Sequence, residues 1–143
     1  METATQTPHL VKEAYQVMRL TYGLVPIVAG IDKFTNLLTN WEQYLHPALT
    51  QALPFSPAIF MMLVGVIEII AGLVVLTKPH IGGFIVMAWL ALIGVSLIAA
   101  NQYLDVAVRD LVMAIGAFSL ARLARTFAVA KAGTETNRKV AFS

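Results

Sequence analysis

Five ionisable residues interrupt otherwise apolar stretches of the chain, and their positions predict one buried polar cluster. They are Asp32, Lys33, Glu68, Arg109 and Asp110. A carboxylate at mid-membrane costs about 2.5–3.5 kcal/mol on insertion scales, so it normally faces the protein interior and has a partner. Glu68 lies near the middle of the most apolar stretch, and Lys33 and Arg109 are its candidate partners. Such a carboxylate beside a base is suited to holding a proton or binding a polar ligand.

The stretch that carries Glu68 is long enough to cross a membrane. Residues 58–76 read AIFMMLVGVIEIIAGLVVL, and as a helix they extend roughly 28 Å, about the thickness of the hydrocarbon core. The whole chain is 58% hydrophobic and only 13% charged, with a mean hydropathy of +0.74. Globular domains are usually about 25% charged. We therefore expect an integral membrane protein rather than a soluble one.

The composition also excludes several classes of function. The chain has no cysteine, which excludes disulfides, thiolate metal sites and iron–sulfur clusters. Its net charge of +2 is small, and nothing indicates nucleic-acid binding. The three histidines lie in loops or the N-terminal segment and share no helix face at ligand spacing, so we expect neither a metal site nor haem ligation. No nucleophile–base pair or phosphate loop is visible, and we expect no catalytic residue.

The hydropathy pattern predicts an all-α fold, a transmembrane four-helix bundle that forms a single domain over residues 15–124. The predicted helices cover about 15–38, 58–76, 81–100 and 106–124, between a frayed polar segment 1–14 and a mobile basic tail 125–143.

Small residues predict the faces along which these helices pack. The first helix carries Gly23 and Gly30 on one face, and the second carries Gly65 and Gly72 on the face of Glu68. Small residues let membrane helices approach closely where lipid provides no hydrophobic drive. For the last helix the same spacing predicts a face that contains Arg109, Val112, Gly116 and Ser119.

The connection between the first two helices, residues 39–57, is the longest and is rich in aromatic residues. We expect it to form a short interfacial helix, capped by Thr39 or Asn40, that covers one end of the bundle. Trp41 and Tyr44 are predicted to be interfacial anchors at headgroup level rather than a ligand site.

The distribution of basic residues predicts the orientation. With four crossings, seven of the ten Lys and Arg residues fall on one side, and the loops on the other side have none. The positive-inside rule then places both termini in the cytoplasm. On this topology Lys33 and Arg109 lie one to two turns shallower than Glu68, so a direct pair requires long side chains that reach inward, or a bridging water or ligand.

Three short motifs resemble those of the DoxX-like family of small four-helix membrane proteins. They are R-L-x-x-G-x-x-x-x-x-x-G-x-x-K at 19–33, E-x-x-x-G-L at 68–73 and R-D-L at 109–111. The resemblance covers about residues 19–123. It implies a multi-pass protein of a bacterial inner membrane in a redox context, because several relatives are subunits or neighbours of redox complexes. It does not imply one reaction.

Three functional hypotheses follow. The first is a subunit of a quinone-linked complex that anchors a partner or contributes a site for quinone, the possible cofactor, near Glu68 and Arg109. The second is a non-catalytic scaffold or assembly factor, whose polar cluster only fixes helix register. The third and weakest is a small transporter. In each case we expect the partners to be the lipid bilayer and other membrane subunits or further copies of the chain, and no catalysis by the chain alone.

Overall fold

The computed structural model describes the backbone of residues 2–142 and the side chains of residues 8–142. Within this part the chain is all-helical. The elements in order are α1 (Glu2–Thr35), the 3₁₀ helix η1 (Trp41–Tyr44), α2 (Pro47–Ala52), α3 (Pro57–Thr77), α4 (Pro79–Ala99) and α5 (Leu104–Ala141).

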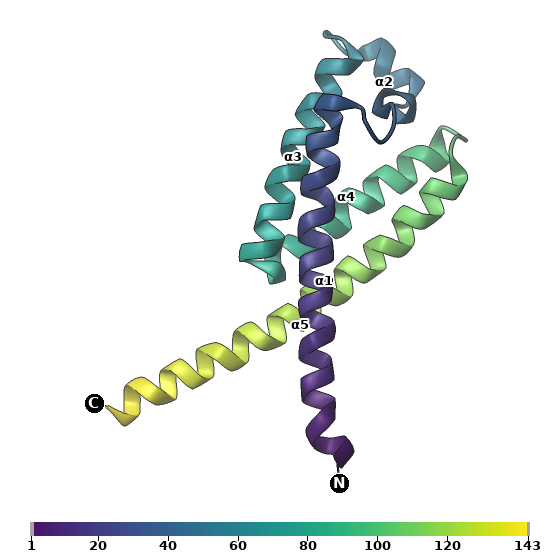
Figure 1. Cartoon of the computed structure of the whole chain (residues 1–143). Helices are drawn as coiled ribbons and strands as arrows, with labels where there is room; N and C mark the ends of the chain where they lie inside the picture. The colour runs from purple at the N-terminus through teal and green to yellow at the C-terminus, as the bar shows by residue number, and fades with distance from the viewer. Residues whose placement is uncertain (1, 143) are drawn as a thin grey trace.

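The four long helices form two antiparallel hairpins, which Figure 1 shows crossing one another. One hairpin pairs α1 with α3, and the other pairs α4 with α5. Contacts between the hairpins are fewer, and run mainly from α3 to α4 and from α1 to α5. The hairpins diverge toward the end that carries α2. The arrangement is therefore a crossed pair of hairpins rather than a parallel-sided four-helix bundle.

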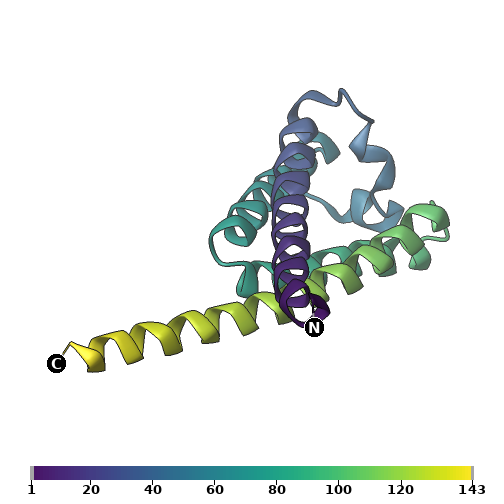
Figure 2. The same cartoon turned by 60° about the horizontal axis from the view of Figure 1, so that its bottom comes forward.

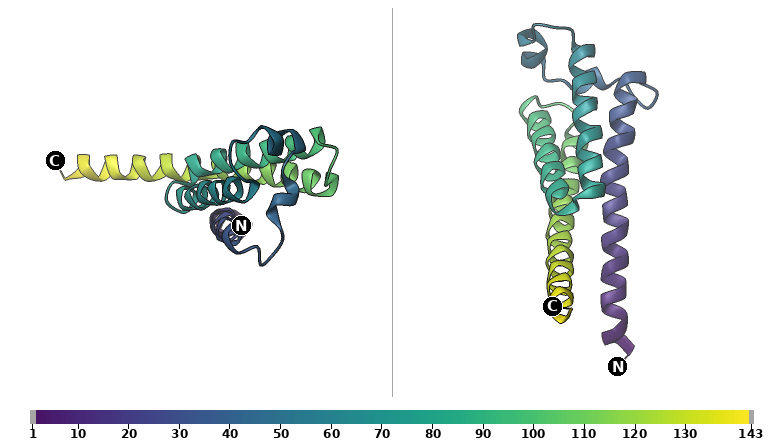
Figure 3. Two further views of the ribbon diagram at one scale, coloured as in Figure 1. Left: turned by 90° about the horizontal axis from the view of Figure 1, so that it is seen from above. Right: turned by 90° about the vertical axis from the view of Figure 1, so that its left-hand side faces the viewer.

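Both termini lie at one end of the molecule, and the connection between α1 and α3 lies at the other (Figure 3). The first part of α1 and the last part of α5 extend beyond the hairpins as separate rods. The predicted frayed segment 1–14 is helical from Glu2, and the predicted mobile tail is helical to Ala141. Its alanine-rich composition explains this, since no residue between Leu104 and Ala141 is a proline and alanine is the strongest helix former.

Local residues determine where the helices begin and end. Asn36 adopts a left-handed conformation with φ 51°, which ends α1 three residues earlier than the expected boundary at 38. The Ser56 side chain accepts a hydrogen bond from the backbone N–H of Ile59, and Pro57 occupies the first position of α3. A single residue, Lys78, separates α3 from α4, which agrees with the expected tight turn.

Glycines bring α1 and α3 into backbone contact, as their spacing predicts. A Cβ atom at Gly30 would meet the Gly65 carbonyl oxygen, and one at Gly65 would meet the Gly30 carbonyl oxygen. Gly23 and Gly72 form a second such approach. The predicted face of α3 is confirmed, since Gly65, Glu68 and Gly72 are all buried.

The predicted packing face of the last helix is wrong. Arg109, Val112 and Ser119 are exposed, and α5 instead packs through a row of small and apolar residues around Asp110. The buried residues of α5 are Ala107, Asp110, Ala114, Ala117, Leu120, Ala121 and Ala124. Because both faces of this segment are apolar, hydropathy gives no indication of which face packs.

The apolar core lies where the hairpins cross. It is formed by buried residues of α1, α3, α4 and α5, which are Tyr15, Ala71, Val75, Val86, Ala117, Leu120 and Ala124. The Tyr15 ring stacks on Phe127 with centroids 4.7 Å apart. The Tyr22 hydroxyl donates a hydrogen bond of 2.9 Å to the carbonyl of Met113, and so joins α1 to α5.

Two helices are long and apolar enough to cross a membrane, Pro57–Thr77 and Pro79–Ala99. Only 33% and 28% of the residues in their apolar windows are buried, so neither helix is mostly enclosed within the described chain. This pattern is weak evidence for membrane association.

Candidate polar site between the hairpins

Lys33 and Glu68 form a direct, buried ion pair at the α1–α3 interface. The Lys33 ammonium lies 2.6 Å from Oε2 of Glu68, and the two residues are only 5% and 7% exposed. Residue 33 is the last basic position of α1, and its side chain reaches the α3 face that carries Gly65. The sequence left open a direct pair or a bridging ligand, and the structure has the direct pair.

Two tryptophans complete the surroundings of this pair. The Trp89 indole N–H, from α4, donates a hydrogen bond of 3.2 Å to Oε1 of Glu68. The Trp41 ring lies over the Lys33 ammonium, with the nitrogen 3.7 Å from the ring centroid. A cation over an indole face is stabilised by about 0.5–2 kcal/mol, more where water is excluded. Both carboxylate oxygens of Glu68 therefore have a donor, and the lysine has two favourable partners.

Asp32 has a separate role at the end of α1. Its carboxylate accepts hydrogen bonds from the backbone N–H groups of Leu37 and Leu38, at 3.0 and 3.1 Å, and from the Thr35 hydroxyl at 3.1 Å. The Trp41 indole N–H donates a fourth bond of 2.7 Å. A negative charge at a helix C-terminus opposes the helix dipole, and these donors offset that cost. Asp32 thus holds the chain where it leaves the helix and orients Trp41 over Lys33.

Arg109 and Asp110 point in different directions, since adjacent residues of a helix differ by about 100°. Arg109 is exposed, and among the side chains of residues 8–142 it has no ion pair with Asp105 or Glu68. Asp110 is 7% exposed, and it interacts electrostatically with the neighbouring Arg109 as well as with Glu68 and Lys33. No hydrogen bond or ion pair of Asp110 is found among the described side chains. Of the two predicted partners of Glu68, the structure therefore brings only Lys33 to it.

The cluster consequently contains one more acid than base. Lys33 balances Glu68, while Asp110 contributes a second buried carboxylate that interacts electrostatically with the exposed Arg109 and has no ion pair with it. Two like charges in a poorly solvated site are costly unless one of them is neutralised.

The connection between α1 and α3 covers this end of the molecule and contacts the tip of the second hairpin (Figure 2). The Tyr44 and Tyr103 rings lie 4.7 Å apart between centroids, and the Tyr103 hydroxyl donates a 3.2 Å hydrogen bond to the Gln43 side chain. Asn40 caps η1, as expected, by accepting a hydrogen bond from the N–H of Glu42. Trp41 and Tyr44 are both half-buried and make these internal contacts. Their predicted anchoring at headgroup level stays a prediction.

Two functional contacts were missed from the sequence. Trp89 lies inside an apolar helix. Because a buried indole N–H usually has a hydrogen-bond acceptor, its position could have indicated a polar partner such as Glu68. Arg19, in α1, donates hydrogen bonds from Nε (2.9 Å) and from Nη2 to the carbonyl of Leu76. This carbonyl is one of the last four of α3, which lack partners within the helix, so Arg19 caps α3.

The polar cluster does not have the composition of a metal centre. Within the described part of the chain, no three His, Cys, Asp or Glu side chains are grouped so that they could hold a metal ion. Comparison of the chain with protein-family models, with curated proteins and with solved structures finds no match.

Proposed function

We propose that this chain is a multi-pass membrane protein and acts as a non-catalytic anchor or scaffold subunit of a membrane complex. The observation that carries the proposal is that many large apolar residues lie on the outer surface of the helices. Large apolar side chains point outward on the helices, among them Leu24, Ile67, Leu92 and Val112 at 50%, 47%, 62% and 61% exposure. The interior holds glycines, alanines and the Lys33–Glu68 pair besides the apolar core. This is the arrangement expected where lipid is the solvent.

The outward apolar residues occupy comparable lengths of four helices. They run from Leu20 to Phe34 on α1, Ile59 to Leu73 on α3, Ile81 to Ile98 on α4 and Val108 to Phe118 on α5. This supports four crossings, two more than length and composition alone identify. Beyond this belt both α1 and α5 continue as rods that carry polar residues together with exposed apolar ones such as Leu10 and Val129, and these rods offer surfaces to a partner subunit.

The proposed location is a bacterial inner membrane with both termini in the cytoplasm. The position of both termini at one end of the molecule and the concentration of Lys and Arg at that end support this orientation. Reporter fusions after Ser143 and after Gln51, in the connection, test it. We expect a cytoplasmic signal from the first and a periplasmic signal from the second, and the reverse pattern would overturn the orientation.

The anchoring role is supported by the complete pairing of Glu68. A carboxylate whose two oxygens both have donors is suited to fixing how α1, α3 and α4 pack. The test is purification of the native protein in mild detergent, with mass spectrometry of the subunits that accompany it. We expect a stoichiometric membrane or peripheral partner. Isolation only as single chains or homo-oligomers would contradict the anchoring role.

A second candidate function, proton or quinone handling in a redox complex, is favoured by Asp110. This buried carboxylate has no hydrogen bond among the described side chains, and it interacts electrostatically with Arg109, Glu68 and Lys33. It is the context that the DoxX-like resemblance implies. Asp110→Asn in the native complex should then abolish quinone-linked turnover while expression and thermal stability are kept. Unchanged turnover would leave only the anchoring role.

A further inference from the structure

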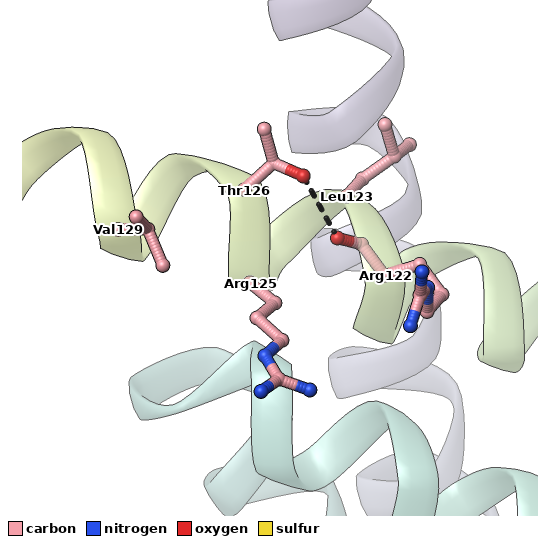
Figure 4. A pocket seen from close by; sticks show the side chains of 5 residues that line it. All are labelled: Arg122, Leu123, Arg125, Thr126 and Val129. Atoms are coloured by element: carbon pink, nitrogen blue, oxygen red, sulfur yellow. Dashed lines mark hydrogen bonds between the residues drawn. The ribbon is translucent and has the colours of Figure 1, made fainter.

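Two arginines lie just beyond the outward apolar belt of α5 at the end of the molecule that holds the termini. Arg122 and Arg125 follow the last outward apolar residue of the belt, Phe118, by about one and two helical turns. Figure 4 shows both guanidinium groups extending to the side of α5 on which Val129 lies, while Leu123 and Thr126 extend to the other side; all five residues line an open hollow. The position combines positive charge with an adjacent apolar wall.

The packing of α4 on α5 places a third base beside them. Gly83 lies against Ala121, and Gly94 lies against Leu111 and Ala107, which fixes the antiparallel register of the two helices. If this register is extended by about one turn from Gly83 toward the start of α4, Lys78 lies at the level of Arg125 along the helix axis. Lys78 is exposed and forms the turn from α3 to α4.

None of these three bases is neutralised by an acid of the described chain. The two ion pairs among the side chains of residues 8–142 are His9–Glu13 and Lys33–Glu68. From Leu104 to Arg122, α5 rises about 27 Å, close to the thickness of the hydrocarbon core. If α5 crosses the membrane, Arg122 and Arg125 therefore lie at the depth of the lipid phosphates of one leaflet.

We propose that Lys78, Arg122 and Arg125 form a binding site for the phosphate group of an anionic phospholipid, with an acyl chain along the apolar face of α5. The guanidinium groups hydrogen-bond phosphate oxygens, and Lys78 contributes a point charge. Basic pockets between membrane helices on the cytoplasmic side are a known mode of recognition of anionic headgroups. This lipid site rests on the proposed membrane topology. It extends that proposal by naming the class of lipid that the protein binds.

The test compares lipid retention by the intact protein and two paired variants. The purified protein in mild detergent receives equimolar phosphatidylglycerol and phosphatidylcholine with identical acyl chains, and native mass spectrometry counts the lipids that stay bound. We expect preferential retention of phosphatidylglycerol. At about fivefold per basic residue near an anionic headgroup, Arg122→Gln with Arg125→Gln should reduce this preference about 25-fold.

A matched control lies on the same helix. Arg138→Gln with Lys139→Gln also removes two charges, but these residues lie about 24 Å further along α5 from Arg122 and beside Glu135. This variant should keep the phosphatidylglycerol preference. An equal loss in both variants would overturn the site, because it would reflect net charge alone.

Further outcomes separate the possible occupants. If inorganic phosphate displaces the bound lipid, the patch is a site for soluble anions and the lipid proposal fails. If the arginine variant loses a co-purifying protein while its lipid preference is unchanged, an acidic protein segment occupies the patch instead, and the lipid proposal also fails.

The topology is checked separately by flotation with phosphatidylcholine vesicles after reconstitution. A protein that floats but shows no phosphatidylglycerol preference contradicts only the lipid site. A protein that remains in the soluble fraction contradicts the membrane topology itself.

Discussion

The two hairpins achieve close helix packing by the same means but fix their register differently. Gly30 and Gly65 bring the backbones of α1 and α3 together, and Gly83 and Gly94 do the same for α4 and α5. The first pair is joined by a connection of some twenty residues, and the second by the short turn that contains Tyr103.

A short turn restricts how far two helices can slide past one another, whereas a long connection does not. The α4–α5 hairpin therefore needs no buried ion pair between its helices, and the described side chains show none there. The α1–α3 hairpin has Lys33–Glu68. The comparison indicates that a buried charge pair serves register where chain connectivity cannot, a role best known from polar residues in coiled coils.

Breaking the charge pair from one side should have the largest effect. Lys33→Met leaves Glu68 buried without its counter-ion, and breaking a buried pair in this way costs about 3–5 kcal/mol. We expect a large fall in the unfolding midpoint, measured by denaturant or thermal unfolding in detergent. Lys33→Met with Glu68→Met replaces both charges by apolar groups of similar volume and should recover most of the stability. If Lys33→Met were as stable as the native protein, the ion pair would not be what stabilises the α1–α3 hairpin.

Separating the backbones of α1 and α3 should have the next largest effect. A side chain at residue 65 meets the Gly30 carbonyl, so Gly65→Val should cost about 1–3 kcal/mol through overpacking. Gly133→Ala in the α5 rod is the control, since nothing lies within 4 Å of its Cβ position. This change should leave stability unchanged or raise it by up to about 1 kcal/mol. A loss in Gly133→Ala as large as that in Gly65→Val would contradict close approach to Gly30 as the cause of the destabilisation.

The hydrogen bond between the hairpins should contribute less. Trp89→Phe keeps a ring in α4 but removes the donor to Glu68, and hydrogen bonds to charged groups contribute about 1.5–3 kcal/mol. Because Lys33 still pairs with Glu68, we expect a loss near the lower end of this range. Unfolding of this variant in a Lys33→Met, Glu68→Met background should show almost no further loss. A full additional loss there would assign the effect of Trp89 to packing.

The smallest effect is expected at Asp110. Its carboxylate has no hydrogen bond among the described side chains and adds an acid to the cluster, so Asp110→Asn should leave stability unchanged or slightly raised. Glu68→Gln, by contrast, removes a paired charge and should destabilise. The two variants measured together by thermal unfolding in detergent sharpen the distinction between a paired and an unpaired buried acid. Marked destabilisation by Asp110→Asn would indicate a partner in the folded protein.

The long apolar helices could be predicted from the sequence alone, because an apolar run of membrane length is visible in the hydropathy pattern without any knowledge of tertiary contacts. The expected helix 58–76 differs from α3 by one residue at each end. The sequence also determined the α1–α3 interface, since glycines spaced three to four residues apart on both helices mark faces that can approach closely. Glu68 was identified for a related reason, as a charge in a segment where charges are costly.

Only the tertiary structure decided which residues meet Glu68. Lys33 reaches it and Arg109 does not, because α5 presents Asp110 and its alanines inward and leaves Arg109 outside. The spacing of apolar residues could not predict which face of α5 packs inward, because this helix has apolar residues on all sides. Trp41 and Trp89 join the site from segments distant in sequence, through one N–H and one ring face. Their roles depend on how the two hairpins cross, and long-range packing rather than local sequence fixes that crossing.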